Sequence, residues 1–171
     1  MRLLVTDAAA QPPRQATAWL IMTLGRKPTA TYTMSNMIDY SERFNEIGGA
    51  ISQKAFSGAS LEFAEAVIMD VYWQYVQVSN GGFEQWLGNS GIERAKSTVA
   101  SLKTVGSSVV LRITEEFLAT LPKELDNDAA INMHLKNLTP EEYEDYSRFS
   151  HSYYDFEEDV AALAVKYYES N

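Results

Sequence analysis

The sequence contains no cysteine, and this absence excludes several kinds of chemistry. Without a thiol the chain forms no disulfide, offers no thiolate to a metal ion and has no cysteine nucleophile. There are two histidines, and His151 shares a helix face only with Asp155, four residues later, whereas zinc sites use at least three protein ligands. The sequence therefore predicts no metal and no cofactor, and the lack of cysteine favours a cytoplasmic protein.

Long apolar runs are also missing, and glycine and proline are scarce. The longest apolar stretches are far shorter than the roughly 18 residues that a membrane span needs, so no membrane association is expected. Only 9 of the 171 residues are glycine and 5 are proline, while 46% are hydrophobic, which is typical of a folded globule. A chain of this length can bury the core of one domain.

Basic residues are few, and they are unevenly placed. The chain has 14 basic and 23 acidic residues, for a net charge of -9. Residues 1–34 hold four basic residues and one acid, a charge of +3, so the rest carries -12. Phosphate contacts supply most of the affinity for nucleic acid. We therefore expect no direct binding of nucleic acid, and a basic partner protein instead.

The first 34 residues read differently from the remainder. Prolines at 12, 13 and 28 flank a short apolar stretch, residues 18–22, which has neither the length of a membrane helix nor the small-residue cleavage site of a signal peptide. We interpret residues 1–34 as a variable N-terminal arm or extension. Residues 35–171 are predicted to form a single helical domain.

Helical periodicity dominates from residue 35 onward. One helix is expected over 35–56, weakened or bent at Gly48-Gly49, and Ser60 is a candidate cap for the next. Apolar residues then recur every three or four positions from Ala64 to Val78, which predicts a central buried helix. The glycines after Asn80 are expected to end it.

Three further helical regions follow, and no run alternates as a strand does. Ser90 and Glu93 suggest a capping box for a helix to about residue 105, and another helix is expected from Val109 to Leu121. Residues 123–138 are interpreted as a polar connection. Thr139, followed by proline and two glutamates, predicts the start of an aromatic, amphipathic helical region that reaches the C-terminus. The predicted fold is an all-α, compact bundle of about six or seven helices.

No catalytic motif is present. The glycines in residues 79–91, SNGGFEQWLGNSG, lack the spacing and the lysine of a phosphate loop, and no G-x-S-x-G nucleophile pattern occurs. Adjacent acids such as Glu115 and Glu116 point about 100° apart on a helix and do not share a site. We therefore expect that the protein is not an enzyme.

The same stretch resembles a bacterial protein family. An aromatic-rich helix, Tyr72-Trp73-Gln74-Tyr75, is followed by the letters NGGFEQWLGNSG, residues 80–91. This combination is similar to the hallmark of a DNA-mimic protein family, an acidic all-helical domain first catalogued as a domain of unknown function. The likeness covers residues 37–171. It implies a homodimer whose acidic surface occupies the DNA-binding face of a transcriptional regulator.

Structural roles are expected for the residues of this motif. The asparagine at its start would cap or tether the loop, the two glycines permit a turn, the two aromatic rings fill the core, and the later amides satisfy loop backbone groups. The alternative is a ligand-binding or enzymatic pocket built from these amides and the tryptophan. The motif residues are Asn80, Gly81, Gly82, Phe83, Gln85, Trp86 and Asn89.

Acidic residues are densest near the C-terminus. From residue 139 to 171 there are nine acids and two basic residues, a net charge of -7. Acids three or four residues apart on a helix have Cβ atoms about 5 to 6 Å apart, comparable to successive phosphates along a nucleic-acid strand. Taken with the family resemblance, which implies DNA mimicry, these acids predict a protein-binding module that mimics DNA, although acids that serve solubility only remain the alternative. The predicted partner-binding residues are Glu141, Glu142, Glu144, Asp145, Asp155, Glu157, Glu158 and Asp159.

Overall fold

The computed structural model describes residues 39–155 and 158–171, so the predicted arm over 1–34 lies outside the described residues. The described residues form six helices and no strand, which confirms the all-α prediction. The helices are α1 (Tyr40–Phe56), α2 (Phe63–Thr104), α3 (Val109–Thr120), α4 (Asp128–Lys136), α5 (Pro140–Tyr154) and α6 (Val160–Glu169).

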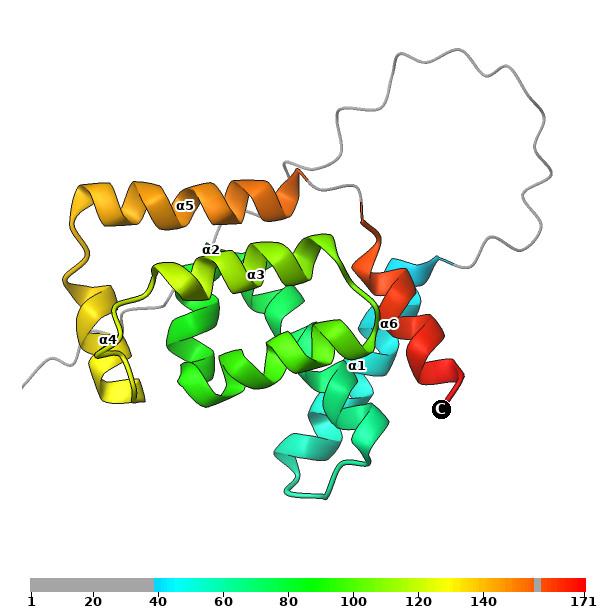
Figure 1. Cartoon of the computed structure of the whole chain (residues 1–171). Coiled ribbons are helices and arrows are strands. Elements are labelled where there is room, and N and C mark those ends of the chain that lie inside the picture. The colour runs from blue at the N-terminus through cyan, green and yellow to red at the C-terminus, as the bar shows by residue number, and fades with distance from the viewer. Residues whose placement is uncertain (1–38, 156–157) are drawn as a thin grey trace, which may run out of the picture. The chain divides into compact units, whose positions relative to one another are not determined.

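Helix α2 is the centre of the bundle. It contacts each of the other five helices, with α1 and α6 packed against each other at one end and α3 packed along α5 at the other (Figure 1). The apolar stripe predicted for this helix is buried at Val67, Ile68, Val71 and Val78. The prediction of a central buried helix is confirmed.

Two glycine breaks divide α2 into three helical segments that run in different directions (Figure 1). The backbone leaves the helical conformation at Gly81 and Gly82, and again at Gly91. Gly82 has φ +76° and ψ -175°, and Gly91 has φ +70° and ψ 171°, a combination that is essentially restricted to glycine. The predicted end of the central helix at Asn80-Gly81-Gly82 is therefore a sharp break between consecutive segments.

The helix starts follow the sequence only in part. Helix α5 begins with the predicted capping box, in which Thr139 and Glu142 exchange backbone-to-side-chain hydrogen bonds. Helix α2, in contrast, begins after Glu62 and not at Ser60, and the Glu62 N–H donates to the Glu65 carboxylate over 2.8 Å. The Ser90 hydroxyl accepts a hydrogen bond from the indole N–H of Trp73 in the first segment of α2. The third segment starts at the Gly91 break.

Helix α1 is continuous across the glycine pair at which it was expected to weaken or bend. The position of Gly48 leaves no room for a side chain, which would overlap the ring of Tyr72. The missing side chain lets α1 approach α2 closely, and the Phe44 ring packs edge-on against Tyr72 beside it, with centroids 5.4 Å apart. This packing stabilises a helix that local propensity disfavours.

The polar connection predicted over 123–138 contains a helix, α4. Asn127 caps it by accepting a hydrogen bond from the Ala130 N–H over 3.0 Å. Ile131 is its one fully buried residue, so the nine-residue helix has almost no apolar periodicity to detect. The aromatic face predicted for α5 is also incomplete, because Tyr143 is 61% exposed while Tyr146 and Tyr153 are buried.

Candidate functional site

The aromatic residues of the glycine motif lie in the core. Phe83 and Trp86, the two residues predicted to fill it, are both fully buried. The ring centroid of Phe83 lies 4.7 Å from that of Phe117 in α3 and 5.8 Å from that of Tyr153 in α5. The motif therefore joins α2 to the two helices that cover it.

The amides of the motif meet at one buried glutamine. Gln85 and Asn89 donate hydrogen bonds of 3.0 Å and 2.6 Å to the same oxygen, Oε1 of Gln77. Gln77 belongs to the first segment of α2 and is 8% exposed, whereas both donors belong to the second segment. The amides thus bridge the break through a side chain, and not through the loop backbone groups that the sequence suggested.

Gly82 fits tightly against α5. The backbone N–H of Phe83 donates to Ser150 Oγ over 3.1 Å, and a Cβ placed on Gly82 would lie 2.7 Å from the same oxygen. Asn80 is exposed, and its side chain makes no hydrogen bond within the described residues. The glycine and the serine, more than the asparagine, hold the break in place.

The alternative of a ligand site built from the motif receives no support from this arrangement. The Trp86 side chain is fully buried, so its ring does not face solvent. Gln85 and Asn89 use their amide donors on Gln77. Gln85, Trp86 and Asn89 therefore belong to a joint between helical segments, in which the two amides bond to Gln77 and the buried Trp86 Nε1 has no hydrogen-bond partner among the described residues.

A second polar cluster, which the sequence did not indicate, ties the first segment of α2 to the third. Ser97 and Ser101 donate to the Asp70 carboxylate over 2.5 Å and 3.1 Å, and Arg94 Nε lies 3.5 Å from it. The Arg94 guanidinium also lies over the ring of Trp73, 4.9 Å from its centroid, and burial lowers the pKa of this arginine. This cluster holds α2 in its folded-back course.

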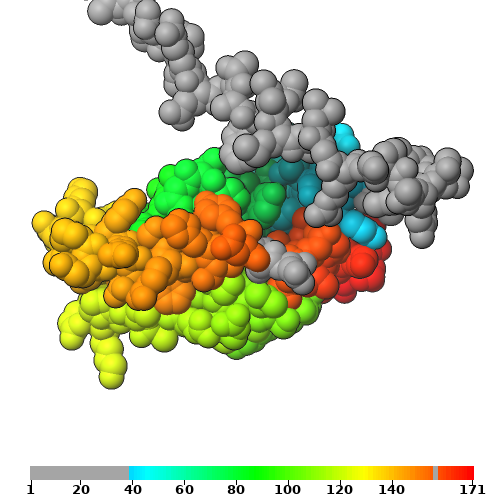
Figure 2. All heavy atoms as spheres, turned by 90° about the horizontal axis from the view of Figure 1, so that it is seen from above, coloured from blue at the N-terminus to red at the C-terminus, as the bar shows by residue number. Residues whose placement is uncertain are grey.

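Several of the predicted partner-binding acids lie on the outer side of α5. Glu141, Glu144, Asp145 and Asp155 are exposed, and Figure 2 shows α5 running along one face of the molecule beside α4 and α3. The carboxylates of Glu141 and Glu144 form no ion pair or hydrogen bond within the described residues. Asp145 pairs with Arg148 on the same helix.

Other predicted acids bind within the fold. The Glu142 carboxylate accepts the Thr139 N–H over 2.8 Å, and this hydrogen bond lowers the pKa of Glu142. Asp159 caps α6 by accepting the Ala162 N–H over 2.8 Å. Glu157 lies outside the described residues. The structure thus separates an exposed group of acids on α5 from acids that complete helix ends.

Glu158, predicted as a partner-binding acid, has an internal role instead. Its carboxylate accepts hydrogen bonds from the Ser107 hydroxyl over 2.6 Å and from the N–H groups of Ser108, Val109 and Val110 over 2.8 to 3.2 Å. Partial burial alone would raise its pKa, but these hydrogen bonds lower the pKa of Glu158 to about 2. The side chain caps the N-terminus of α3, so it is not free to contact a partner.

Positive charge on the described surface is largely paired with carboxylates. Ten basic residues lie in the described ranges, and seven of them form ion pairs. The surface therefore has few basic groups available for an anion. The paired residues are Arg43, Lys54, Arg94, Lys96, Lys103, Arg112 and Arg148.

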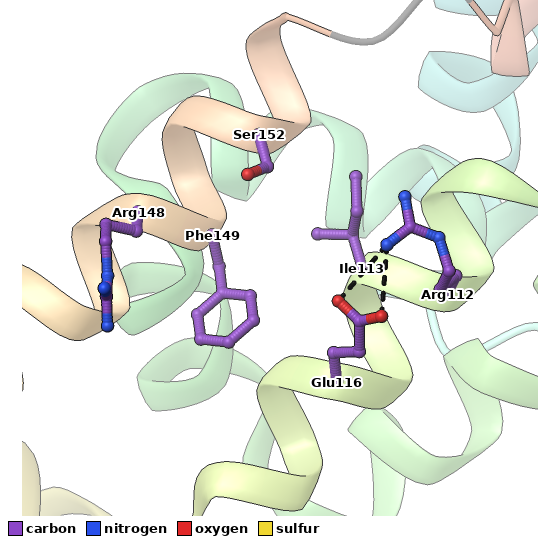
Figure 3. Close-up of a pocket in the computed structure, with 6 residues that line it drawn as sticks. All are labelled: Arg112, Ile113, Glu116, Arg148, Phe149 and Ser152. Carbon is purple, nitrogen blue, oxygen red and sulfur yellow. Dashed lines mark hydrogen bonds and ion pairs between the residues drawn. The ribbon is translucent and has the colours of Figure 1, made fainter.

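A hollow of about 260 Å³ between α3 and α5 has an arginine on either side (Figure 3). Arg112 pairs with Glu116 on its own helix at 3.1 Å, and Arg148 pairs with Asp145. The ring of Phe149 lies between the two arginines (Figure 3). Because each guanidinium already has a carboxylate partner, the hollow does not offer an open anion site.

The acidic and histidine side chains of the described ranges do not gather into a metal site. No three acidic or histidine side chains there could hold a metal ion together. His134 instead lies against Tyr146, with Nε2 2.9 Å from the phenol oxygen. None of the described helices is long and apolar enough to cross a membrane.

These features define an acidic, all-helical domain organised around a two-glycine joint. A family model described as DMP19-like protein matches residues 59–171, which is most of the chain. The protein therefore belongs to the DMP19-like family. The comparison thus supports membership of this family over residues 59–171, whereas the likeness predicted from the sequence began at residue 37. No curated protein and no solved structure gave a significant match.

Proposed function

We propose that this protein is a non-enzymatic binding module that presents the acids of α5 to the DNA-binding face of a basic regulatory protein. The observation that carries the proposal is that Glu141 and Glu144 are exposed and lack a cationic partner within the described residues. They are three residues apart on one helix, so their Cβ atoms are about 5 to 6 Å apart. A rigid helix with this spacing offers fixed negative charges to a groove that binds phosphates.

The charge balance of the chain supports the same partner chemistry. A net charge of -9 and the pairing of most described basic residues disfavour direct contact with nucleic acid. They favour a protein surface rich in lysine and arginine. As part of the proposal, the protein acts in the cytoplasm as a homodimer and uses no cofactor.

Salt-dependent capture followed by competition tests this function. The tagged full chain is incubated with host lysate at about 0.1 M and about 1 M salt, where exposed charges are screened over roughly 10 Å and 3 Å. We expect a DNA-binding protein to be captured at low salt only. The purified partner is then titrated with its DNA in the presence of increasing amounts of this protein, which should displace the DNA.

A matched pair of double variants locates the contact. Glu141→Gln with Glu144→Gln removes two charges from α5, and Glu42→Gln with Glu124→Gln removes two exposed charges elsewhere. We expect only the α5 variant to lose capture and competition. Equal behaviour of the two variants, or capture that is indifferent to salt, would contradict the proposal and favour acids that serve solubility only.

A further inference from the structure

A second hollow, of about 420 Å³, lies next to the glycine motif. Glu84 from the second segment of α2 lines it, together with Leu135, Leu138 and Pro140 from the end of α4 and the start of α5. A short connection joins α4 to α5 at this end of the bundle (Figure 1). The hollow therefore combines apolar walls with one acidic group.

Glu84 is the only charged residue among residues 80–91 of the motif, and its carboxylate is not in salt-bridge contact with a basic side chain of the described residues. No ion pair to Glu84 occurs within the described residues, and its carboxylate is hydrogen-bonded to its own backbone N–H. Partial burial raises the pKa of this carboxyl group. A desolvated carboxylate without a counter-charge is costly unless something binds it.

An exposed aromatic ring lines the same hollow. Tyr143 is 61% exposed, whereas Tyr146, three residues later on α5, is buried. The face of a tyrosine ring attracts a cation, and an arginine guanidinium stacks on it well. The apolar walls suit the aliphatic stem of a long basic side chain.

We propose that this hollow binds an arginine side chain, with the guanidinium paired to Glu84 and stacked on Tyr143. The planar guanidinium can donate two parallel hydrogen bonds to a carboxylate and is less strongly hydrated than an ammonium group. The inference rests on the proposed function in one respect, because it assigns the arginine to the DNA-binding partner. The acids of α5 would then guide the partner, and Glu84 would hold one of its side chains.

Lys136 allows a second test of the proposal, in which the expected effect has the opposite sign. Its side chain lines the same hollow, is exposed and forms no ion pair within the described residues. A positive charge at this place repels a guanidinium, so its removal should strengthen binding. An anionic ligand would respond in the opposite direction.

The test uses the full chain and a capped Gly-Arg-Gly peptide, with the corresponding citrulline peptide as an uncharged analogue. Binding is followed by NMR titration. We expect the arginine peptide to shift the signals of Glu84, Leu135 and Tyr143, and the citrulline peptide to bind about tenfold more weakly or not at all. Glu84→Gln should lower the affinity about fivefold or more, whereas Lys136→Gln should raise it by roughly twofold.

Glu42→Gln is the matched control, because it removes one exposed charge from α1, away from the hollow. An equal loss of affinity in Glu84→Gln and Glu42→Gln would show that only net charge matters and would overturn the proposal. Weaker binding after Lys136→Gln would overturn it as well. Glu84→Gln removes a charge and keeps the size of the side chain, and its melting curve reports whether it is folded.

Capture from lysate separates this inference from the proposed function. If Glu84→Gln captures the DNA-binding protein as well as the unmodified chain does, and the arginine peptide does not bind, the arginine site is wrong and the proposed function stands. If the peptide binds through Glu84 but no DNA-binding protein is captured, the proposed function fails and the arginine site stands.

Discussion

The Glu158 carboxylate accepts a 2.8 Å hydrogen bond from the backbone N–H of Ser108, a residue 50 positions earlier in the chain. Ser108 is the N-cap residue of α3, but its own side chain makes no capping hydrogen bond. The connection between α5 and α6 supplies the cap in its place. The start of α3 is therefore fixed by Glu158, which follows α5, and α5 is the helix that packs against α3.

Replacing Glu158 by glutamine should destabilise the fold. The change removes the negative charge from the N-terminus of α3 and weakens its hydrogen bonds, and we expect a loss of about 1 to 2 kcal/mol in the free energy of unfolding. The partial exposure of the side chain keeps the effect in this range. Urea denaturation measures it, with the exposed Asp155→Asn as a control that should change stability little. Equal effects of the two substitutions would contradict the capping role.

The stabilisation by Glu158 should disappear in acid. Its pKa is about 2 in the folded protein, below the roughly 4.3 of an unfolded glutamate, so the folded state binds the proton less readily. The contribution is complete above the unfolded pKa and is lost as the pH falls from about 4.5 towards 2. The difference in unfolding free energy between the unmodified chain and Glu158→Gln should shrink over this range. A difference that does not vary with pH would be inconsistent with this assignment.

Alanine substitutions at two glycines should have opposite effects. At Gly82 an alanine would be strained at φ +76° and its Cβ would lie 2.7 Å from Ser150 Oγ, so we expect a loss of roughly 1 to 3 kcal/mol. At Gly49, inside α1, a Cβ meets no atom within 4 Å, and alanine should stabilise by about 0.5 to 1 kcal/mol. Melting temperatures of the two variants test the pair. A Gly82→Ala variant as stable as the unmodified chain would show that the break is not fixed.

Gln77→Leu should cost more stability than Gln85→Ala. The first change removes the acceptor that Gln85 and Asn89 share, and each lost hydrogen bond costs about 0.5 to 1.5 kcal/mol. The second removes one donor and leaves the 2.6 Å bond from Asn89 in place. Combining the two substitutions should give less than the sum of the single effects, because they share one interaction. Strict additivity in a double-mutant cycle would exclude the shared acceptor.

Glu84→Gln should stabilise the isolated protein. Burial raises the pKa of Glu84 in the folded state above its pKa in the unfolded state. The folded protein therefore loses stability as the pH rises through the interval between these two pKa values. We expect a higher melting temperature at pH 7. The gain in the free energy of unfolding should be less than about 1 kcal/mol, because the carboxylate is partly solvated. The two proteins should be equally stable near pH 3, where both side chains are neutral. Loss of stability at pH 7 would mean that the carboxylate has a structural partner.

The helices with strong periodicity could be predicted from the sequence, and the weaker one could not. The stripe containing Val67 and Val71 and the capping box at Thr139 are local patterns, and each specifies its own element. Helix α4 buries Ile131 alone and depends on its contacts with α2, so local pattern does not reveal it. Gly48 lowers the local helix propensity of α1. Its packing role, which is to leave room for the ring of Tyr72, depends on α2 and is not visible in the local sequence.

The sequence by itself determined the helical class, the break at the glycine pair and the acidic character, because periodicity, glycine conformation and formal charge depend on the residues themselves. Only the tertiary structure decided the use of each polar group. It assigned Glu158 to a helix end, joined Gln85 and Asn89 through Gln77, and left Glu141 exposed. Hydrogen bonds and desolvation are set by which groups meet across the fold, and residues far apart in the chain are brought together only by packing.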